Sequence, residues 1–184
     1  MDLEVLTKDK LKLLSKEVFS CKKCARLYPL RKIASLGFGN FNSKIMMIAQ
    51  NPGIPLEREF GLDYGDVLKN SKMGKYLTKV LHVADLTWKD IYYTNICKCP
   101  SPNNSIINEN EIKNCSEYLI QQINELQPKI IITLGKIAEN NLPRSCKLLF
   151  TTYNWYHPAY LWRKSTDEHR AILKSYIRDL KGIL

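Results

Sequence analysis

The sequence contains no apolar run long enough to cross a membrane, no internal repeat and no low-complexity tract. A membrane-spanning helix needs about 20 apolar residues, so we expect no membrane partner. Residues 1–20 mix charged and apolar side chains at helical spacing, which is not the pattern of a signal peptide. We therefore expect an intracellular, monomeric protein with a single domain over residues 1–184, because this length suits one hydrophobic core.

Acidic residues are scarce relative to basic ones, with 18 Asp and Glu against 28 Lys and Arg and a formal net charge of +10. The basic excess lies at both ends of the chain. Residues 1–33 carry nine basic and four acidic residues, and residues 144–184 carry eight and three. This distribution favours an anionic partner, although a basic surface that only aids solubility would give a similar charge.

Short apolar runs alternate with helical patterns along the chain. Continuous apolar runs are typical of strands covered on both faces, and their alternation with helices indicates a parallel sheet. We therefore predict an α/β fold: a three-layer domain with a central four-stranded parallel sheet flanked by helices. The predicted strands are residues 44–50, 90–96, 129–134 and 147–152, and the predicted helices are 5–19, 73–84, 109–126, 135–142 and 166–181.

Polar residues follow the predicted strands. Gln50 and Asn51 follow the first strand, Asn95 lies near the end of the second, and His157 follows the fourth. Ligands of such sheets bind beyond the carboxyl ends of the strands. Amide and imidazole groups gathered there could read the polar edge of a nucleobase, with aromatic side chains stacking on its face.

Four of the six cysteines form a pattern. Cys21 and Cys24 are a C-x2-C pair, and Cys99 and Cys115 follow on a loop and a helix. Disulfides are rare inside cells, and four thiolates favour zinc or an iron–sulfur cluster. Spacing alone leaves both open. We interpret Cys97, at the end of a strand, as a small buried apolar side chain.

With these motifs, the chain resembles the uracil-DNA glycosylase superfamily, and its iron–sulfur branch (family 4) in particular. The resemblance runs from Cys21 to the C-terminal helix. Its motifs are the C-x2-C pair, T-N-I-C-K-C at residues 94–99, Cys115, L-G-K-I-A at residues 134–138 and Y-H-P-A-Y-L at residues 156–161. The resemblance implies a structural [4Fe–4S] cluster, with zinc as the alternative. The implied ligands are Cys21, Cys24, Cys99 and Cys115.

The first catalytic motif departs from this branch. Family 4 usually has G-E-A-P-G, whereas residues 49–53 here read A-Q-N-P-G. The N-P-G portion is similar to the mismatch-specific and single-strand-selective families, in which this asparagine helps to position water. The departure leaves the preferred base open among uracil, hypoxanthine, xanthine and thymine opposite guanine, with uracil favoured.

The resemblance implies hydrolysis of the bond between a flipped, deaminated base and deoxyribose in DNA. His157 would stabilise the leaving base, Asn51 would position water, and Asn95 would read the base edge, with Gln50 and Gly53 lining the pocket. Each has a simpler interpretation as a turn or capping residue. No lysine lies within residues 50–53 or beside His157, so a monofunctional enzyme is indicated.

The resemblance also predicts contacts with stacked bases and phosphates. Tyr64 is the candidate platform for the flipped base, with Phe60 as its rival. The predicted DNA contacts are Tyr160, Leu161, Trp162, Arg163 and Lys164. A second hypothesis remains open, namely a non-catalytic iron–sulfur module that has the same fold and binds nucleic acid.

Overall fold

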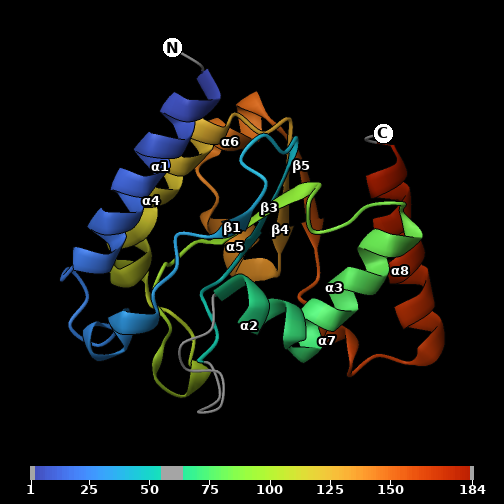
Figure 1. The fold of residues 1–184 in the computed structure, drawn as a ribbon. Helices are drawn as coiled ribbons and strands as arrows, with labels where there is room; N and C mark the ends of the chain where they lie inside the picture. Colours follow the sequence, from blue (N-terminus) through green and yellow to red (C-terminus); the bar gives the residue numbers. More distant parts are fainter. Residues whose placement is uncertain (1–2, 55–63, 183–184) are drawn as a thin grey trace.

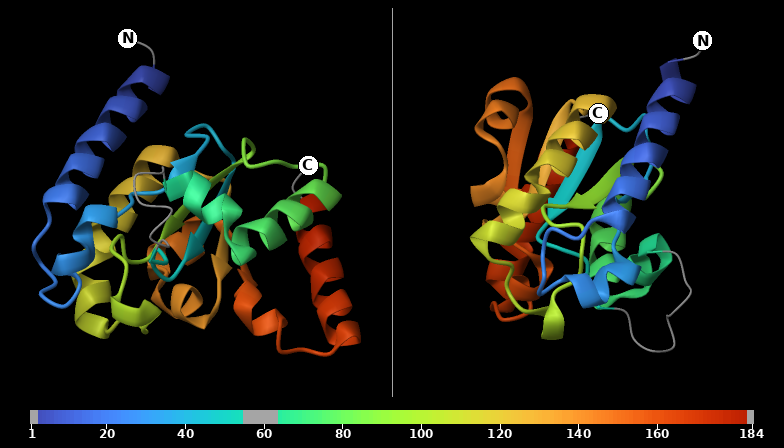
Figure 2. Two further views of the ribbon diagram at one scale, coloured as in Figure 1. Left: turned by 60° about the horizontal axis from the view of Figure 1, so that its bottom comes forward. Right: turned by 90° about the vertical axis from the view of Figure 1, so that its left-hand side faces the viewer.

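The computed structural model describes residues 3–54 and 64–182, which form one sheet between two groups of helices (Figures 1 and 2). The strand order is β1-β3-β2-β4-β5. Four strands run parallel, and only β1 pairs antiparallel, with β3. The strands are β1 (Phe38–Gly39), β2 (Ile45–Ala49), β3 (Ile91–Asn95), β4 (Ile130–Leu134) and β5 (Thr151–Trp155). The predicted α/β fold is confirmed, and the short edge strand β1 is an addition to the four predicted strands.

Strands β2, β3 and β4 are buried along their whole length, as their continuous apolar sequences predicted. Successive side chains point to opposite faces of a strand. Met46 and Ile48 accordingly enter one core, and Met47 and Ala49 enter the other. The sheet therefore carries a hydrophobic core on each face.

Helices α1 and α4 lie side by side over one face, while α3 and α8 cover the other (Figure 1). Helices α5 and α6 contribute to the first core, and α2 and α7 to the second. None of the described helices is long and apolar enough to span a membrane. The helices are α1 (Leu3–Ser20), α2 (Tyr64–Asn70), α3 (Lys72–Val83), α4 (Glu109–Leu126), α5 (Lys136–Asn141), α6 (Arg144–Leu149), α7 (Pro158–Leu161) and α8 (Thr166–Lys181).

The predicted fourth strand, residues 147–152, is wrong in its first half. Residues 144–149 form helix α6, and the strand begins at Thr151. Leu148 and Leu149, which suggested a buried strand, are 86% and 76% exposed. The true strand β5 lies at the edge of the sheet and is mostly open to solvent, so its sequence lacks a continuous apolar run. The shift leaves His157 two residues beyond the end of β5.

Candidate active site

The carboxyl ends of the four parallel strands bring the predicted polar residues to one edge of the sheet. Backbone hydrogen bonds extend this edge beyond the strands, since Ile96 donates to Ala49 and Gly135 donates to Trp155, both at 2.8 Å. Asn95 is the last residue of β3, opposite Ala49 in β2. The segments carrying Gln50, Asn95, Gly135 and His157 are therefore held beside one another by main-chain contacts.

Asn95 is fully buried and its side chain is only half satisfied. Its Nδ2 donates to the hydroxyl of Tyr64 at 3.2 Å. Its Oδ1 has no hydrogen-bond partner among the described residues. A buried acceptor without a donor costs about 1–3 kcal/mol. This oxygen is thus suited to receive an N–H from a ligand.

Tyr64, the first residue of α2, lies beside Asn95. Burial raises the pKa of its hydroxyl to about 12, so the group is neutral at physiological pH. The Tyr64 ring meets Phe38 edge-on, with 6.0 Å between ring centroids. Phe60, the rival stacking residue, lies outside the described residues. The stacking role of Tyr64 stays a prediction.

His157 caps the N-terminus of α7. Its Nδ1 accepts a hydrogen bond from the backbone N–H of Ala159 at 3.2 Å, and burial lowers the pKa of the ring. A neutral ring that accepts at Nδ1 carries its proton on Nε2. Gly135 lies directly beneath, because a Cβ atom there would meet the Cβ of His157 at 3.1 Å. The site therefore presents a neutral N–H donor.

The amide of Asn51 is held at both ends. Its Oδ1 accepts from Gln50 Nε2 at 2.8 Å, and its Nδ2 donates to the carbonyl of Pro52 and to Ser101 Oγ, each at 3.2 Å. Sequence reasoning missed Ser101, because no local pattern relates it to a residue 50 positions earlier. Gly53 is open, since a Cβ there would meet only an amide oxygen at 3.9 Å.

The segment after His157 exposes aromatic and basic side chains. Tyr156 and Tyr160 stack with 4.9 Å between ring centroids, and Trp162 lies under the ammonium of Lys72. Arg163 is exposed on the same segment. These groups are accessible to a nucleic acid, as their predicted role requires.

Two predicted DNA contacts on this segment are altered by the structure. Leu161 has no exposed surface and packs in the second core, so we withdraw its assignment as a DNA contact. Lys164 forms an ion pair with Glu168 at 3.0 Å, which partly neutralises the charge of the lysine. Arg163 is therefore the better candidate for a phosphate contact.

Five cysteines line one small cavity between α1, α4 and the segment after β3. Cys97 is fully buried in the first core, which confirms the prediction of a small buried apolar side chain. It also lines the cavity and hydrogen-bonds with Cys115, a contact that the sequence did not predict. The Cys97 hydrogen bond and the neighbouring Lys98 lower the pKa of Cys115 to about 7, so Cys115 loses its proton more readily than an ordinary cysteine. In the described part of the chain, no group of three or more His, Cys, Asp or Glu is arranged to hold a metal ion. The cysteines lining the cavity are Cys21, Cys24, Cys97, Cys99 and Cys115.

Lys98 joins this cavity to Asn95. Its backbone N–H donates to Cys115 Sγ at 3.3 Å. Its buried ammonium donates to the carbonyl of Asn95 at 2.7 Å, to Thr94 Oγ1 at 2.8 Å and to Gln122 Oε1. Burial lowers its pKa to about 8. With three acceptors around it, this lysine fixes the end of β3.

A family model described as the uracil DNA glycosylase superfamily matches residues 36–181. A type-4 uracil-DNA glycosylase of Saccharolobus solfataricus is 40% identical over 135 residues, which cover 73% of this chain and 59% of that protein. The type-4 enzyme of Archaeoglobus fulgidus is 32% identical over 137 residues, covering 74% and 65%. This chain thus matches less than two thirds of the length of these archaeal relatives. The type-4 enzyme of Thermotoga maritima is 26% identical, covering 95% and 94%.

A solved structure of similar fold is that of wild-type SMUG2 from Pedobacter heparinus. It aligns with a TM-score of 0.55 and 15% identity, covering 77% of this chain and 76% of that one. At this identity the likeness concerns the fold alone, and it agrees with the sheet and helix layers described above.

Proposed function

The chain belongs to the uracil-DNA glycosylase superfamily, and we propose that it is a monofunctional glycosylase that removes a flipped uracil from DNA and leaves an abasic site. The observation that carries this proposal is the buried, unpaired Oδ1 of Asn95. Uracil presents an N–H at N3 and an acceptor at O4. An amide complements both, with its oxygen on N3–H and its Nδ2 on O4.

This arrangement discriminates against cytosine. Cytosine presents an acceptor at N3 and an amino donor at N4, which is the opposite pattern. A fixed amide would then leave buried polar groups unpaired on both molecules, and such mismatches give strong rejection. In the free protein, Asn95 Nδ2 donates to the hydroxyl of Tyr64, so this hydrogen bond must open before the amide can bind O4 of the base.

His157 and Asn51 supply the two functions that hydrolysis needs. The bond between N1 of uracil and C1′ breaks, and its electron pair leaves with the base. The Nε2–H of His157 stabilises that anion at O2. Asn51 holds the water whose oxygen forms the new bond to C1′. The proton lost by the water ends on the departed base through solvent, so the products are neutral uracil and an abasic site.

A lyase step is not part of the proposal. Such a step needs an unprotonated amine that attacks C1′. Lys98 is the buried lysine nearest to the base-reading residue, but its ammonium is engaged by three acceptors behind the end of β3. Tyr160, Trp162, Arg163 and Lys164 would contact the DNA around the flipped base.

We infer a structural [4Fe–4S] cluster from the chemistry of the cavity's cysteines, because an all-thiolate donor set favours such clusters or zinc. Cys21, Cys24, Cys99 and Cys115 would hold the group. When bound, it would contribute cross-linking of α1, α4 and the segment after β3 and no chemistry on the base. We expect brown protein with iron stoichiometric with the chain.

The iron content of purified variants tests the cluster. Cys99→Ser should lose iron and unfold at a lower temperature, whereas Cys146→Ser, a buried cysteine outside the cavity, should keep its iron. Colourless protein with stoichiometric zinc would instead establish the alternative metal.

An end-labelled oligonucleotide with a single uracil tests the activity. We expect an alkali-labile site at the uracil and free uracil in solution, with no cleavage of the matched oligonucleotide that carries thymine. The altered first motif, with Gln50 in place of an acidic residue, favours a second candidate, a non-catalytic module that binds nucleic acid. Binding without release of uracil or another deaminated base would support that module and refute the glycosylase.

A further inference from the structure

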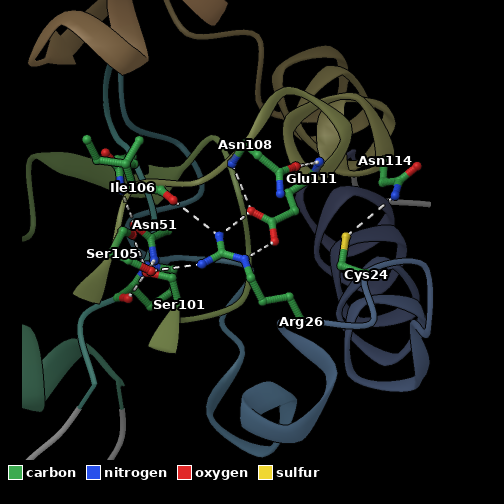
Figure 3. A network of polar contacts seen from close by, with 11 residues as sticks. Cys24, Arg26, Asn51, Ser101, Ser105, Ile106, Asn108, Glu111 and Asn114 are labelled. Atoms are coloured by element: carbon green, nitrogen blue, oxygen red, sulfur yellow. Dashed lines mark hydrogen bonds and ion pairs between the residues drawn. The ribbon is translucent and has the colours of Figure 1, made fainter. Parts of the chain in front are cut away.

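The segment of residues 100–108, here called the connecting segment, links the cysteine cavity to the candidate active site. It begins after Cys99 and ends at Asn108, the N-cap of α4. Figure 3 shows polar contacts that run from Glu111, which lines the cavity, through Arg26 and this segment to Asn51, with the contact between Asn114 and Cys24 apart from them. The roles proposed for Asn95 and His157 do not require any of these contacts.

Arg26 anchors the connecting segment to α4. Its guanidinium binds Glu111 with both ends of the fork, from Nε at 2.7 Å and Nη2 at 2.6 Å. The same group donates to Ser105 Oγ at 2.8 Å and to the carbonyl of Ile106 at 3.2 Å (Figure 3). Glu111 is 4% exposed, and its pKa is lowered first of all by Arg26. A bidentate pair of this kind fixes orientation as well as charge.

Both members of this pair lie next to cavity cysteines. Arg26 follows Cys24 by two residues, and Glu111 precedes Cys115 by one turn of α4. Asn114, also on α4, donates to Cys24 Sγ at 3.6 Å and to a backbone carbonyl at 3.0 Å. The position of the connecting segment thus depends on how the cysteine cavity holds α4 and the chain after α1.

Ser101 is the point where the segment touches the active site. Its side chain is fully buried, and its hydroxyl donates to the carbonyl of Ser105 at 2.5 Å. Because this proton is committed, the oxygen can only accept, and it accepts from Asn51 Nδ2 at 3.2 Å. Ser101 and the carbonyl of Pro52, which also can only accept, therefore together hold the nitrogen end of the Asn51 amide. Asn51 Oδ1 then faces Gln50 and can accept one more hydrogen bond, because an amide oxygen takes two.

We propose that Ser101 is a positioning residue that, together with the carbonyl of Pro52, holds the Asn51 amide in the orientation that binds the water, and that Arg26 and Glu111 connect Ser101 to the cysteine site. The inference rests on the proposed glycosylase function. The cysteine site would then affect the rate of uracil cleavage without contacting the DNA. Loosening the cavity would release the connecting segment, and with it the orientation of the amide.

A double-mutant cycle tests the proposal. Single-turnover cleavage of the uracil oligonucleotide is measured for wild type, Ser101→Ala, Asn51→Ala and the double variant. Affinity is measured on the same sequence carrying 2′-fluoro-deoxyuridine, which resists cleavage. We expect Ser101→Ala to slow cleavage about tenfold without changing affinity, the scale of one lost hydrogen bond. In the Asn51→Ala background the same change should have no further effect.

Two further variants separate positioning from stability. Ser101→Thr keeps the hydroxyl and should restore most of the rate, and Arg26→Lys keeps the charge but loses the fork and should slow cleavage only when Asn51 is present. Ser175→Ala, which removes a hydroxyl bonded within α8, is the control and should cleave at the wild-type rate.

Additive effects of Ser101→Ala and Asn51→Ala in an active protein would overturn the inference and leave the glycosylase function standing. Equal slowing by Arg26→Lys with and without Asn51 would overturn the link to the cysteine site. A wild-type protein that releases no deaminated base would remove the proposed function, and the inference with it.

Discussion

His157 shows how local contacts select one protonation state of a catalytic candidate. Burial lowers the pKa of the ring, and the backbone of Ala159 occupies Nδ1. The folded protein therefore favours the neutral ring. This preference is lost as the pH falls through the pKa of the folded state. A neutral N–H donor can stabilise the leaving base, so the ring does not have to be charged before the reaction.

The pH dependence of cleavage follows from this state. The unperturbed pKa of histidine is about 6.5, and the folded value lies below it. We expect the single-turnover rate to be flat from about pH 7.5 to 8.5, because a pKa below 6.5 leaves at least about nine tenths of the rings neutral in this range. A tenfold fall in rate per pH unit above neutrality would indicate instead that a charged imidazolium is required.

The sequence proposed most of the candidate reaction residues because they stand in short motifs at strand ends. Asn51, Asn95 and His157 were each proposed from their neighbours in the chain, and their roles stay predictions. Ser101 was not proposed, because it is connected to the site by a hydrogen bond with Asn51 across the fold. Cys97 was predicted to be buried and is buried, but its contact with Cys115 is made across the fold and was not predicted.

At the scale of elements, the turn from β4 into α5 determines where His157 sits. Gly135 has a φ of +94°, a region that residues with a Cβ rarely adopt. The same residue packs against the backbone and Cβ of His157. The turn thus supports His157, the candidate catalytic residue that follows the next strand, and glycine is required for both reasons.

Gly135→Ala should therefore displace His157 and strain the turn. We expect cleavage to fall at least tenfold and the protein to lose about 1–3 kcal/mol of stability, because a φ of 94° with a ψ of 163° is a conformation that is essentially restricted to glycine. Thermal unfolding and single-turnover rates measure both effects. Gly182→Ala, at a position with a negative φ and ordinary contacts for a Cβ, is the control and should change neither.

The elements that sequence reasoning placed well are those with a clear physical signal. The helix over residues 109–126 was predicted with its observed bounds, and its N-cap Asn108 forms a capping box with Glu111. Strand β5 was misplaced because it lies at a sheet edge, where burial no longer imposes an apolar run. Leu148 and Leu149 supplied that run instead, from the exposed side of α6.

At the scale of the whole molecule, the candidate active site lies between two different regions of the structure. The cysteine cavity lies on the side of α1 and α4, and the exposed aromatic and basic segment after His157 lies on the side of α3 and α8 (Figure 1). The first would hold the base-reading and water-holding residues through Lys98 and Ser101. The second is placed to receive the DNA.

DNA binding should depend on salt through this second side. Arg163→Ala should weaken binding to all sequences and reduce the slope of log affinity against log salt by about one. The control is Arg178→Ala, an exposed arginine near the far end of α8, which should leave the slope unchanged. Equal slopes for wild type and Arg163→Ala would restrict the basic segment to a role in solubility.

Changing the amide of Asn95 and measuring which base is released shows most directly whether this residue reads the base. Asn95→Asp offers only acceptors, so we expect uracil cleavage to fall about a hundredfold or more and residual activity to shift toward cytosine. Tyr64→Phe, which removes only the hydroxyl that Asn95 contacts in the free protein, should keep the preference for uracil. If Asn95→Asp cleaves uracil at the wild-type rate with unchanged preference, Asn95 does not read the base and the account is wrong.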